Sequence, residues 1–435
     1  MNNNQNITSS RRHILKAVTG TFVLKNTLQG INFLTTLLLS NTLGQAGFGL
    51  YAVAMAWANI LTIPGKLGSD IHAVRVCAVY SSEKDWNHLY GFLRWIKKKV
   101  WLVSFFVSAL AIAFGVIFLG WGTAESGFTF IFAMFLIPIL SAIQTNFGIL
   151  RGLGSIFYAQ LTNLLQGALI FIIVGIIVIT EKNIKVNTAI LVTVTAAAIA
   201  LLFGMYFLKV HTPPQIKQAI PLTEKSRWWH GIWAFTAIAG VGVLNNRADV
   251  ALLGTLGTME EAGVYAVAKR CTELVGFVLA SVNLVLGPKV AKMYSSGELI
   301  KLERLVRRST LGITAVVIPL GFILVFWGEW ILGMFGDGFK SGFIVLIILT
   351  IGQIINAMFG SVGMILNMSG HEKYTARWLA VIAVINIMLN VFFIPIWGMY
   401  GAAISSIIST VLWNSLLLWT VINKLGINPA IGRIT

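Results

Sequence analysis

Apolar runs of about 18 residues or more recur along the whole chain, and each is long enough to cross a hydrocarbon core of about 30 Å as an α-helix. Of the 435 residues, 57% are hydrophobic and only 11% are charged, whereas soluble domains carry about 25% charged residues. So little charge cannot solvate a globule of this size. The chain is therefore predicted to be an all-α integral membrane protein.

The apolar windows predict twelve membrane-spanning helices. They cover residues 20–41, 47–68, 100–120, 127–147, 157–179, 188–208, 231–253, 263–286, 310–330, 339–360, 377–396 and 399–421. The loop after the second span, at residues 81–99, alternates apolar and basic residues and is predicted to form an amphipathic helix on the inner leaflet.

The formal net charge of +17 is concentrated on one side of the predicted membrane. In the loops and span ends of the other side, Lys182, Lys185 and Lys340 are the only basic residues. Four further cations lie well inside spans, away from their ends: Lys25, Arg247, Lys269 and Arg270. The positive-inside rule then places both termini in the cytoplasm. The basic excess faces anionic lipid there, and nucleic acid is not an expected partner.

Two hexapeptides, GLYAVA at residues 49–54 and GVYAVA at residues 263–268, are nearly identical, and other short matches share their offset. These matches predict two six-helix repeats, residues 1–215 and 216–435. Because six crossings return the chain to the same side, the repeats are parallel and surround a central cavity that works by alternating access. The repeated glycine is expected to allow close helix approach, and the tyrosine to lie at the outer interface.

The chain shows no pattern of nucleotide binding, metal binding or catalysis. Cys77 and Cys271 are far apart and the histidines form no ligand cluster, so we predict packed thiols, solvated or interfacial histidines and no metal site. The outside loops are too short for a catalytic module. We therefore expect no enzyme and no cofactor, and the possible energy sources are a sodium gradient, a proton gradient or the membrane potential.

Charges within spans cost about 2.5–3.5 kcal/mol each, so they normally face water or one another. The second hexapeptide is followed by Lys269, Arg270 and Glu273, and the first by uncharged residues. Lys269 and Glu273 are four residues apart, so they either neutralise each other along one helix face or line a path for an anionic head group.

Arg247 and Asp249 are two residues apart, so their side chains point about 200° apart and cannot pack against the same neighbour. Arg247 is the strongest candidate for phosphate contact, because a guanidinium fork matches phosphate oxygens. Lys25 either extends to lipid head groups or lines the inner mouth of the cavity. The predicted head-group ligands are Lys25, Arg247, Lys269 and Arg270.

Five residues are candidates for binding a coupling ion. Asp249 and Glu273 supply carboxylates for a cation or a proton, and Asn245, Asn386 and Asn390 add the uncharged oxygens that sodium would also need. Asn386 and Asn390 are four residues apart and share one helix face. Asparagine also forms ordinary hydrogen bonds between membrane helices, so packing alone is an alternative explanation.

Five segments carry a family resemblance. They are LRGLG at 150–154, LGQAGFGLYAVA at 43–54, RADVALLGTLGTMEEAGVYAVAKR at 247–270, LGPKVAKMYSSG at 286–297 and LNMSGHEK at 366–373. Together they resemble the polysaccharide flippases of the multidrug, oligosaccharidyl-lipid and polysaccharide (MOP) exporter superfamily. The resemblance implies translocation of undecaprenyl-diphosphate-linked oligosaccharides across the bacterial cytoplasmic (inner) membrane, for O-antigen of lipopolysaccharide, capsule or exopolysaccharide.

The resemblance also implies partners: the lipid-linked oligosaccharide, the phospholipid bilayer and other membrane proteins of polysaccharide assembly, with a monomer as the working unit. One alternative is a cation-coupled exporter of drugs or small molecules from the same superfamily. A cationic drug favours an acidic cavity, whereas the spans here hold four cations against two acids. Another alternative is a membrane-embedded glycan polymerase or ligase, which would need a large outer loop.

Overall fold

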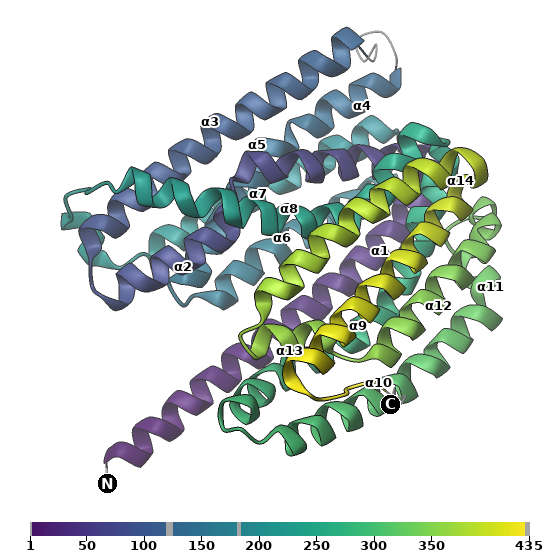
Figure 1. Cartoon of the computed structure of the whole chain (residues 1–435). Coiled ribbons are helices and arrows are strands. Elements are labelled where there is room, and N and C mark those ends of the chain that lie inside the picture. Colours follow the sequence, from purple (N-terminus) through teal and green to yellow (C-terminus); the bar gives the residue numbers. More distant parts are fainter. Residues whose placement is uncertain (1, 119–124, 181–183, 431–435) are drawn as a thin grey trace. The chain divides into compact units, whose positions relative to one another are not determined.

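The computed structural model describes residues 2–118, 125–180 and 184–430, and within these ranges the chain is helical and has no strands (Figure 1). Lys182 of the predicted outer loops lies outside the described residues. Ten helical segments in the described part are long and apolar enough to cross a membrane. The prediction of an all-α, multi-pass membrane protein is therefore confirmed.

The chain forms two compact units. Unit 1 comprises Met1–Leu43 and Ala54–Val243, and unit 2 comprises Gly44–Val53 and Leu244–Thr435. The repeat halves 1–215 and 216–435 are defined by sequence matches rather than by compactness, and they stay a prediction.

Unit 1 is built around helix α5, which packs on α2, α3, α6 and α7. Besides most of α1 (Asn2–Lys66), the unit contains α2 (Ser69–Ser82), α3 (Trp86–Phe118), α4 (Glu125–Met134), α5 (Leu136–Gly152), α6 (Ile156–Thr180), α7 (Val186–His211) and the 3-10 helix η1 (Pro214–Gln218). Helix α8 (Lys225–Leu256) begins in unit 1 and ends in unit 2.

Unit 2 is built around helix α12, which packs on α9, α10 and α14 (Figure 1). Besides the end of α8, its helices are α9 (Met259–Ser295), α10 (Leu299–Phe326), α11 (Gly328–Gly333), the 3-10 helix η2 (Asp337–Gly342), α12 (Phe343–Phe359), α13 (Val362–Met368) and α14 (Glu372–Leu425). A capping box starts α9, because the Thr258 hydroxyl accepts from the Glu261 backbone and the Glu261 carboxylate accepts from the Thr258 backbone.

Two long helices bend at a glycine with positive φ, a conformation that side chains with a Cβ rarely adopt. In α1 the bend is at Gly44 (φ 68°), and in α14 it is at Gly398 (φ 54°). Pro395, which lacks a backbone donor, precedes the second bend. The predicted spans 20–41 and 47–68 are thus two parts of one bent helix rather than two helices separated by a loop, and so are 377–396 and 399–421.

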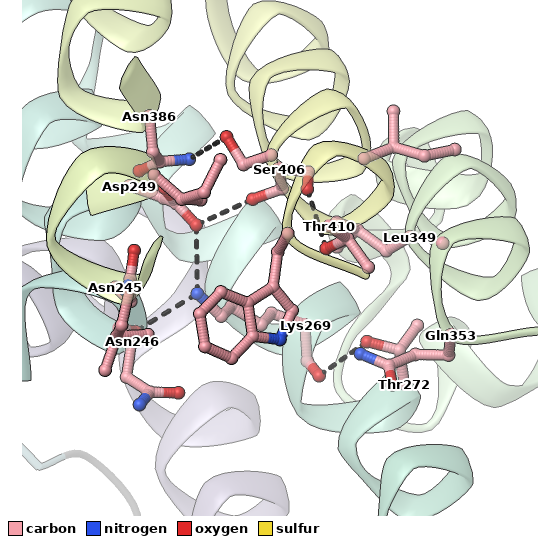
Figure 2. Close-up of a pocket in the computed structure, with 16 residues that line it drawn as sticks. Asn245, Asn246, Asp249, Lys269, Thr272, Leu349, Gln353, Asn386, Ser406 and Thr410 are labelled. Carbon is pink, nitrogen blue, oxygen red and sulfur yellow. Dashed lines mark hydrogen bonds and ion pairs between the residues drawn. The ribbon is translucent and has the colours of Figure 1, made fainter. Parts of the chain in front are cut away.

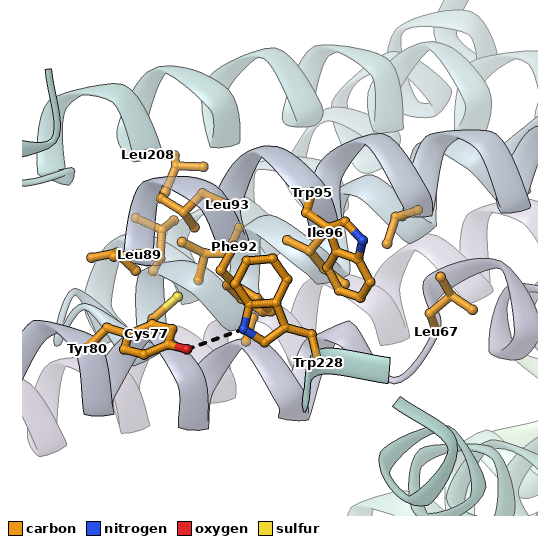
Figure 3. Close-up of a cluster of buried hydrophobic side chains, with 14 of the residues drawn as sticks. Leu67, Cys77, Tyr80, Leu89, Phe92, Leu93, Trp95, Ile96, Leu208 and Trp228 are labelled. Atoms are coloured by element: carbon orange, nitrogen blue, oxygen red, sulfur yellow. Dashed lines mark hydrogen bonds between the residues drawn. The ribbon is translucent and has the colours of Figure 1, made fainter. Parts of the chain in front are cut away.

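A buried aromatic cluster fills the core of unit 1 (Figure 3). Phe92 and Trp95 of α3 lie 5.5 and 5.2 Å from Trp228 of α8, between ring centroids. The indole N–H of Trp228 donates to the Tyr80 hydroxyl at 3.3 Å. Most of the predicted amphipathic helix at residues 81–99 is helical, because it begins α3, but its apolar face packs into this cluster rather than onto lipid.

Both cysteines are buried free thiols, as expected. His72, however, is neither solvated nor interfacial: its ring is buried, stacks on Phe235 at 5.4 Å and meets Phe92 edge-on at 5.5 Å. The sequence pattern did not reveal this burial because the rings that cover His72 come from two other helices.

The two copies of the repeated hexapeptide meet at their glycines in unit 2. A Cβ built on Gly49 of α1 would overlap the carbonyl of Met259 and lie 2.9 Å from the backbone nitrogen of Gly263. A Cβ on Gly263 of α9 would lie 3.1 Å from Cα of Gly49. The predicted close approach is therefore confirmed. Tyr265, in contrast, is fully buried rather than placed at the outer interface.

This crossing makes a prediction about stability. Gly49→Ala should lower the free energy of unfolding by about 1–3 kcal/mol, because the added methyl group forces α1 and α9 apart. The matched control is Gly312→Ala on α10, where a Cβ would meet nothing within 4 Å. The measurement is the thermal unfolding midpoint of detergent-solubilised protein. Equal midpoints for the two variants would contradict the close crossing.

Candidate functional site

Asp249 is a carboxylate buried among the helices of unit 2, with 1% of its surface exposed. It lies on α8 and meets donors from α9 and α14 (Figure 2). Its Oδ2 accepts hydrogen bonds from Lys269 at 3.0 Å, Tyr265 at 2.9 Å and Ser406 at 2.8 Å. Its Oδ1 accepts from Nδ2 of Asn390 at 3.0 Å. Four donors thus surround the carboxylate.

Local helix geometry brings these donors together. Tyr265 and Lys269 are four residues apart on α9 and share one face, with the Lys269 ammonium 5.8 Å from the Tyr265 ring centroid. Asn390 and Ser406 lie on opposite sides of the bend at Gly398 in α14. The bend therefore lets one helix supply two donors to the same carboxylate.

Lys269 and Asp249 form an ion pair between α9 and α8. Burying two charges costs several kcal/mol per ion, which is offset only by close pairing and further hydrogen bonds. Lys269 has such a bond, since its ammonium also donates to the backbone carbonyl of Asn246 at 3.1 Å. The side chain of Asp249 is 2% exposed and that of Lys269 is 21% exposed, so the lysine is the partner with access to water.

The alternative in which Lys269 neutralises Glu273 along one helix is wrong. Glu273 instead pairs with Arg270 at 2.6 Å, three residues away on α9. The i, i+4 pattern considers partners on the same helix only, whereas Lys269 finds a more deeply buried acid on α8.

A cavity of about 250 Å³ lies beside the Asp249 ion pair, within unit 2 (Figure 2). It brings together four of the predicted site residues: Asn245, Asp249, Lys269 and Asn386. Gln353 of α12 and Trp413 of α14 complete part of the wall. The cavity therefore joins a paired charge to amide groups, a lining suited to a polar or charged ligand.

Asn386 and Asn390 share a face of α14, as predicted. Nδ2 of Asn390 donates to the backbone oxygen of Asn386 at 2.9 Å, and Nδ2 of Asn386 donates to Ser409 at 3.1 Å. Oδ1 of Asn390 is buried and has no hydrogen-bond partner among the described residues. The pair is thus part of the packing between helix segments and also leaves one amide oxygen unused.

The other predicted residues are not part of this cavity lining. Arg247 is exposed, as expected for a side chain that points away from buried Asp249. Arg270 and Glu273 are near enough to Arg247 to interact with it electrostatically. Lys25 is exposed on the part of α1 that belongs to unit 1.

Tyr265 and Ser406 were not predicted as site residues. The repeated hexapeptide places Tyr265 four residues before Lys269, and this spacing could have identified it. No local pattern marks Ser406, because its approach to Asp249 depends on the bend at Gly398.

A multi-pass helical protein with buried paired charges beside a polar cavity has the characteristics of a membrane transporter. Residues 14–294, more than half of the chain, match the family model described as polysaccharide biosynthesis protein, and residues 242–392 match the MatE model. The chain belongs to the polysaccharide biosynthesis protein family of the MOP exporter superfamily.

Two curated relatives come from Haloferax volcanii. The probable low-salt glycan biosynthesis flippase Agl15 is 27% identical over 198 residues, which cover 45% of this chain and 40% of that protein. The probable flippase AglR is 25% identical over 300 residues, which cover 66% of this chain and 60% of that protein. The chain thus aligns with less than two thirds of the length of these flippases.

Solved structures share the fold. An inward-facing multidrug resistance MATE family transporter of the MOP superfamily has a TM-score of 0.75 at 15% identity, covering 93% of this chain and 98% of that chain. The lipid II flippase MurJ, in an inward closed conformation, has a TM-score of 0.73 at 14% identity, covering 92% and 87%. These similarities establish a MOP-type transporter fold.

The ion pair makes a second stability prediction. In Na⁺-free buffer, Lys269→Met should destabilise the protein by about 3–5 kcal/mol, because it leaves a buried carboxylate without its counter-charge. Asp249→Asn should cost less, since Lys269 has access to the cavity. The double variant Asp249→Asn/Lys269→Met should regain most of the loss. Unfolding midpoints of the wild type and the three purified variants form a double-mutant cycle. A loss of stability in the double variant equal to the sum of the two single losses would contradict the pairing.

Proposed function

We propose that this protein is a flippase that moves undecaprenyl-diphosphate-linked oligosaccharide units across the cytoplasmic membrane, by alternating access, for surface polysaccharide biosynthesis. The observation that carries the proposal is the match of residues 14–294 to the polysaccharide biosynthesis protein family. The naming of Agl15 as a probable glycan biosynthesis flippase supports it. The undecaprenyl carrier and the inner membrane belong to a bacterial host, whereas these curated relatives are archaeal.

We infer twelve crossings in two parallel repeats, with both termini in the cytoplasm. The ten apolar segments support this number, because Val23–Ser82 contains two of the predicted spans around the bend at Gly44, and α8 supplies one more. The distribution of lysine and arginine supports the orientation.

The proposed cargo combines a diphosphate, a polar glycan and a lipid tail. Within the spans of unit 2, Lys269 is paired with Asp249 and Arg270 with Glu273, so Arg247 is the cation without an ion pair among the described residues. An exposed arginine in hydrocarbon is costly and normally faces water or an anion. We therefore assign the main diphosphate contact to Arg247, with Lys25, Lys269 and Arg270 adding to the attraction.

A second candidate function is cation-coupled export of drugs or small molecules, because residues 242–392 match the MatE model. Away from the span ends, the spans of unit 2 carry three cations and two acids, which disfavours a cationic drug as cargo. A glycan polymerase or ligase has less support, since the curated relatives above are named as flippases.

The flippase proposal predicts the phenotype of a deletion strain. Loss of the gene should abolish the surface glycan and cause its lipid-linked precursor to accumulate on the cytoplasmic leaflet, because the reaction upstream continues while translocation stops. Precursor levels are measured by mass spectrometry of extracted lipids, with a complemented strain as control. Normal surface glycan without precursor accumulation would reject the flippase, and increased ethidium retention in that strain would favour drug export.

The diphosphate contact predicts a graded response at Arg247. Arg247→Ala should reduce glycan export in the complemented strain about 10-fold or more, because it removes charge-assisted hydrogen bonds worth about 1.5–3 kcal/mol. Arg247→Lys should retain part of the activity, since an ammonium keeps the charge but not the fork. Arg308→Ala, at an exposed arginine of α10, is the matched control. Normal export by both Arg247 variants would contradict this role.

A further inference from the structure

We propose that Lys269 is itself the cation of the Asp249 site: its ammonium group takes the place of a dissolved monovalent cation, so that this site neither binds nor requires Na⁺. The absence of Na⁺ binding does not depend on the proposed function. Only its consequence, a transport cycle independent of Na⁺, rests on the proposed function. In this proposal Lys269 decides the ion selectivity of the site.

The Lys269 ammonium lies among the oxygens that a cation would need. It is 3.0 Å from Oδ2 of Asp249 and 3.1 Å from the backbone oxygen of Asn246. Tyr265 and Ser406 donate hydroxyl hydrogen bonds to the same Oδ2, at 2.9 and 2.8 Å, and so bring two further oxygens to this carboxylate. Hard cations prefer such oxygen ligands, and two like charges repel strongly at short range in a low dielectric. Na⁺ therefore does not fit while the ammonium is present.

The side-chain amide of Asn390 turns its amino group toward Asp249, as expected when Lys269 already neutralises the carboxylate. Its Nδ2 faces Oδ1 of Asp249 and the backbone oxygen of Asn386, which are both acceptors, so the amide must turn its amino group toward them. An amide oxygen in this place would repel the carboxylate unless a cation lay between them. Asn390 nevertheless keeps a buried Oδ1 without a partner among the described residues. We expect that unused oxygen to serve as a ligand for a cation that replaces the lysine.

The first half of the chain carries neither charge of the pair. At the offset that relates the two hexapeptides, Thr35 stands at the position of Asp249 and Met55 at the position of Lys269. The acid and the base are thus present together in one half and absent together in the other, as expected if each is tolerated in the membrane only with its partner. Met55 also identifies Lys269→Met as an uncharged replacement of similar length.

The test measures binding of ²²Na⁺ and unfolding midpoints of the purified full-length protein in detergent. The midpoints are compared in NaCl and in N-methylglucamine chloride of equal ionic strength. The wild type should bind no saturable ²²Na⁺ and unfold at the same temperature in both salts. Lys269→Met should gain saturable ²²Na⁺ binding and unfold about 2 °C or more higher in NaCl, because a ligand that binds only the folded state stabilises it.

Two further variants are controls. Asp249→Asn/Lys269→Met should lose the gained ²²Na⁺ binding, because it lacks the carboxylate. Lys269→Gln keeps a polar side chain and replaces Lys269→Met if that variant does not fold. Saturable ²²Na⁺ binding by the wild type that is lost in Asp249→Asn would overturn the proposal, and so would a folded Lys269→Met or Lys269→Gln that binds none. Because no glycan is used, this result is independent of the deletion phenotype.

Discussion

A carboxylate inside a membrane protein must be neutralised where it lies, and unit 2 is arranged around this requirement at Asp249. The acid is on α8, its counter-charge Lys269 is on α9, and the remaining donors lie on both sides of the bend in α14. Displacing any of these helices would leave a polar group of the network without its partner. Since α8 also begins in unit 1, the chain segment that carries the acid links the two units covalently.

The length of the apolar runs and the low content of charged residues were sufficient to predict the all-helical membrane class, because satisfying the backbone within lipid leaves few alternatives to the helix. Contacts between helices were less predictable. The opposite directions of Arg247 and Asp249 followed from their spacing on one helix, and so did the shared face of Asn386 and Asn390, but the spacing did not tell which of Arg247 and Asp249 is buried. The partner of Lys269 did not, because it lies on another helix and no local pattern specifies how α8 and α9 pack.

The repeated hexapeptide illustrates how one short sequence can serve two structural purposes. Its glycine, at Gly49 and Gly263, allows the backbones of α1 and α9 to meet where any side chain would clash. Its tyrosine at Tyr265 is buried and donates to Asp249, an acid that has no counterpart at the matching position of the first half. The sequence match thus marks a helix crossing that packing needs. Lys269, which follows the second copy only, adds the ion pair with Asp249 beside that crossing.

The opposite directions of Arg247 and Asp249 have a consequence for the proposed transport. Asp249 and Lys269 neutralise each other in the interior of unit 2, so Lys269 attracts an approaching anion less strongly than Arg247, which has no ion pair among the described residues. Arg247, two residues earlier on α8, is exposed on the other side of that helix. In the proposed mechanism an anionic head group binds Arg247 without separating the buried pair. The proposed anion contact is thus on one face of α8, and the acid of the proposed cation site is on the other, where Lys269 of α9 pairs with it.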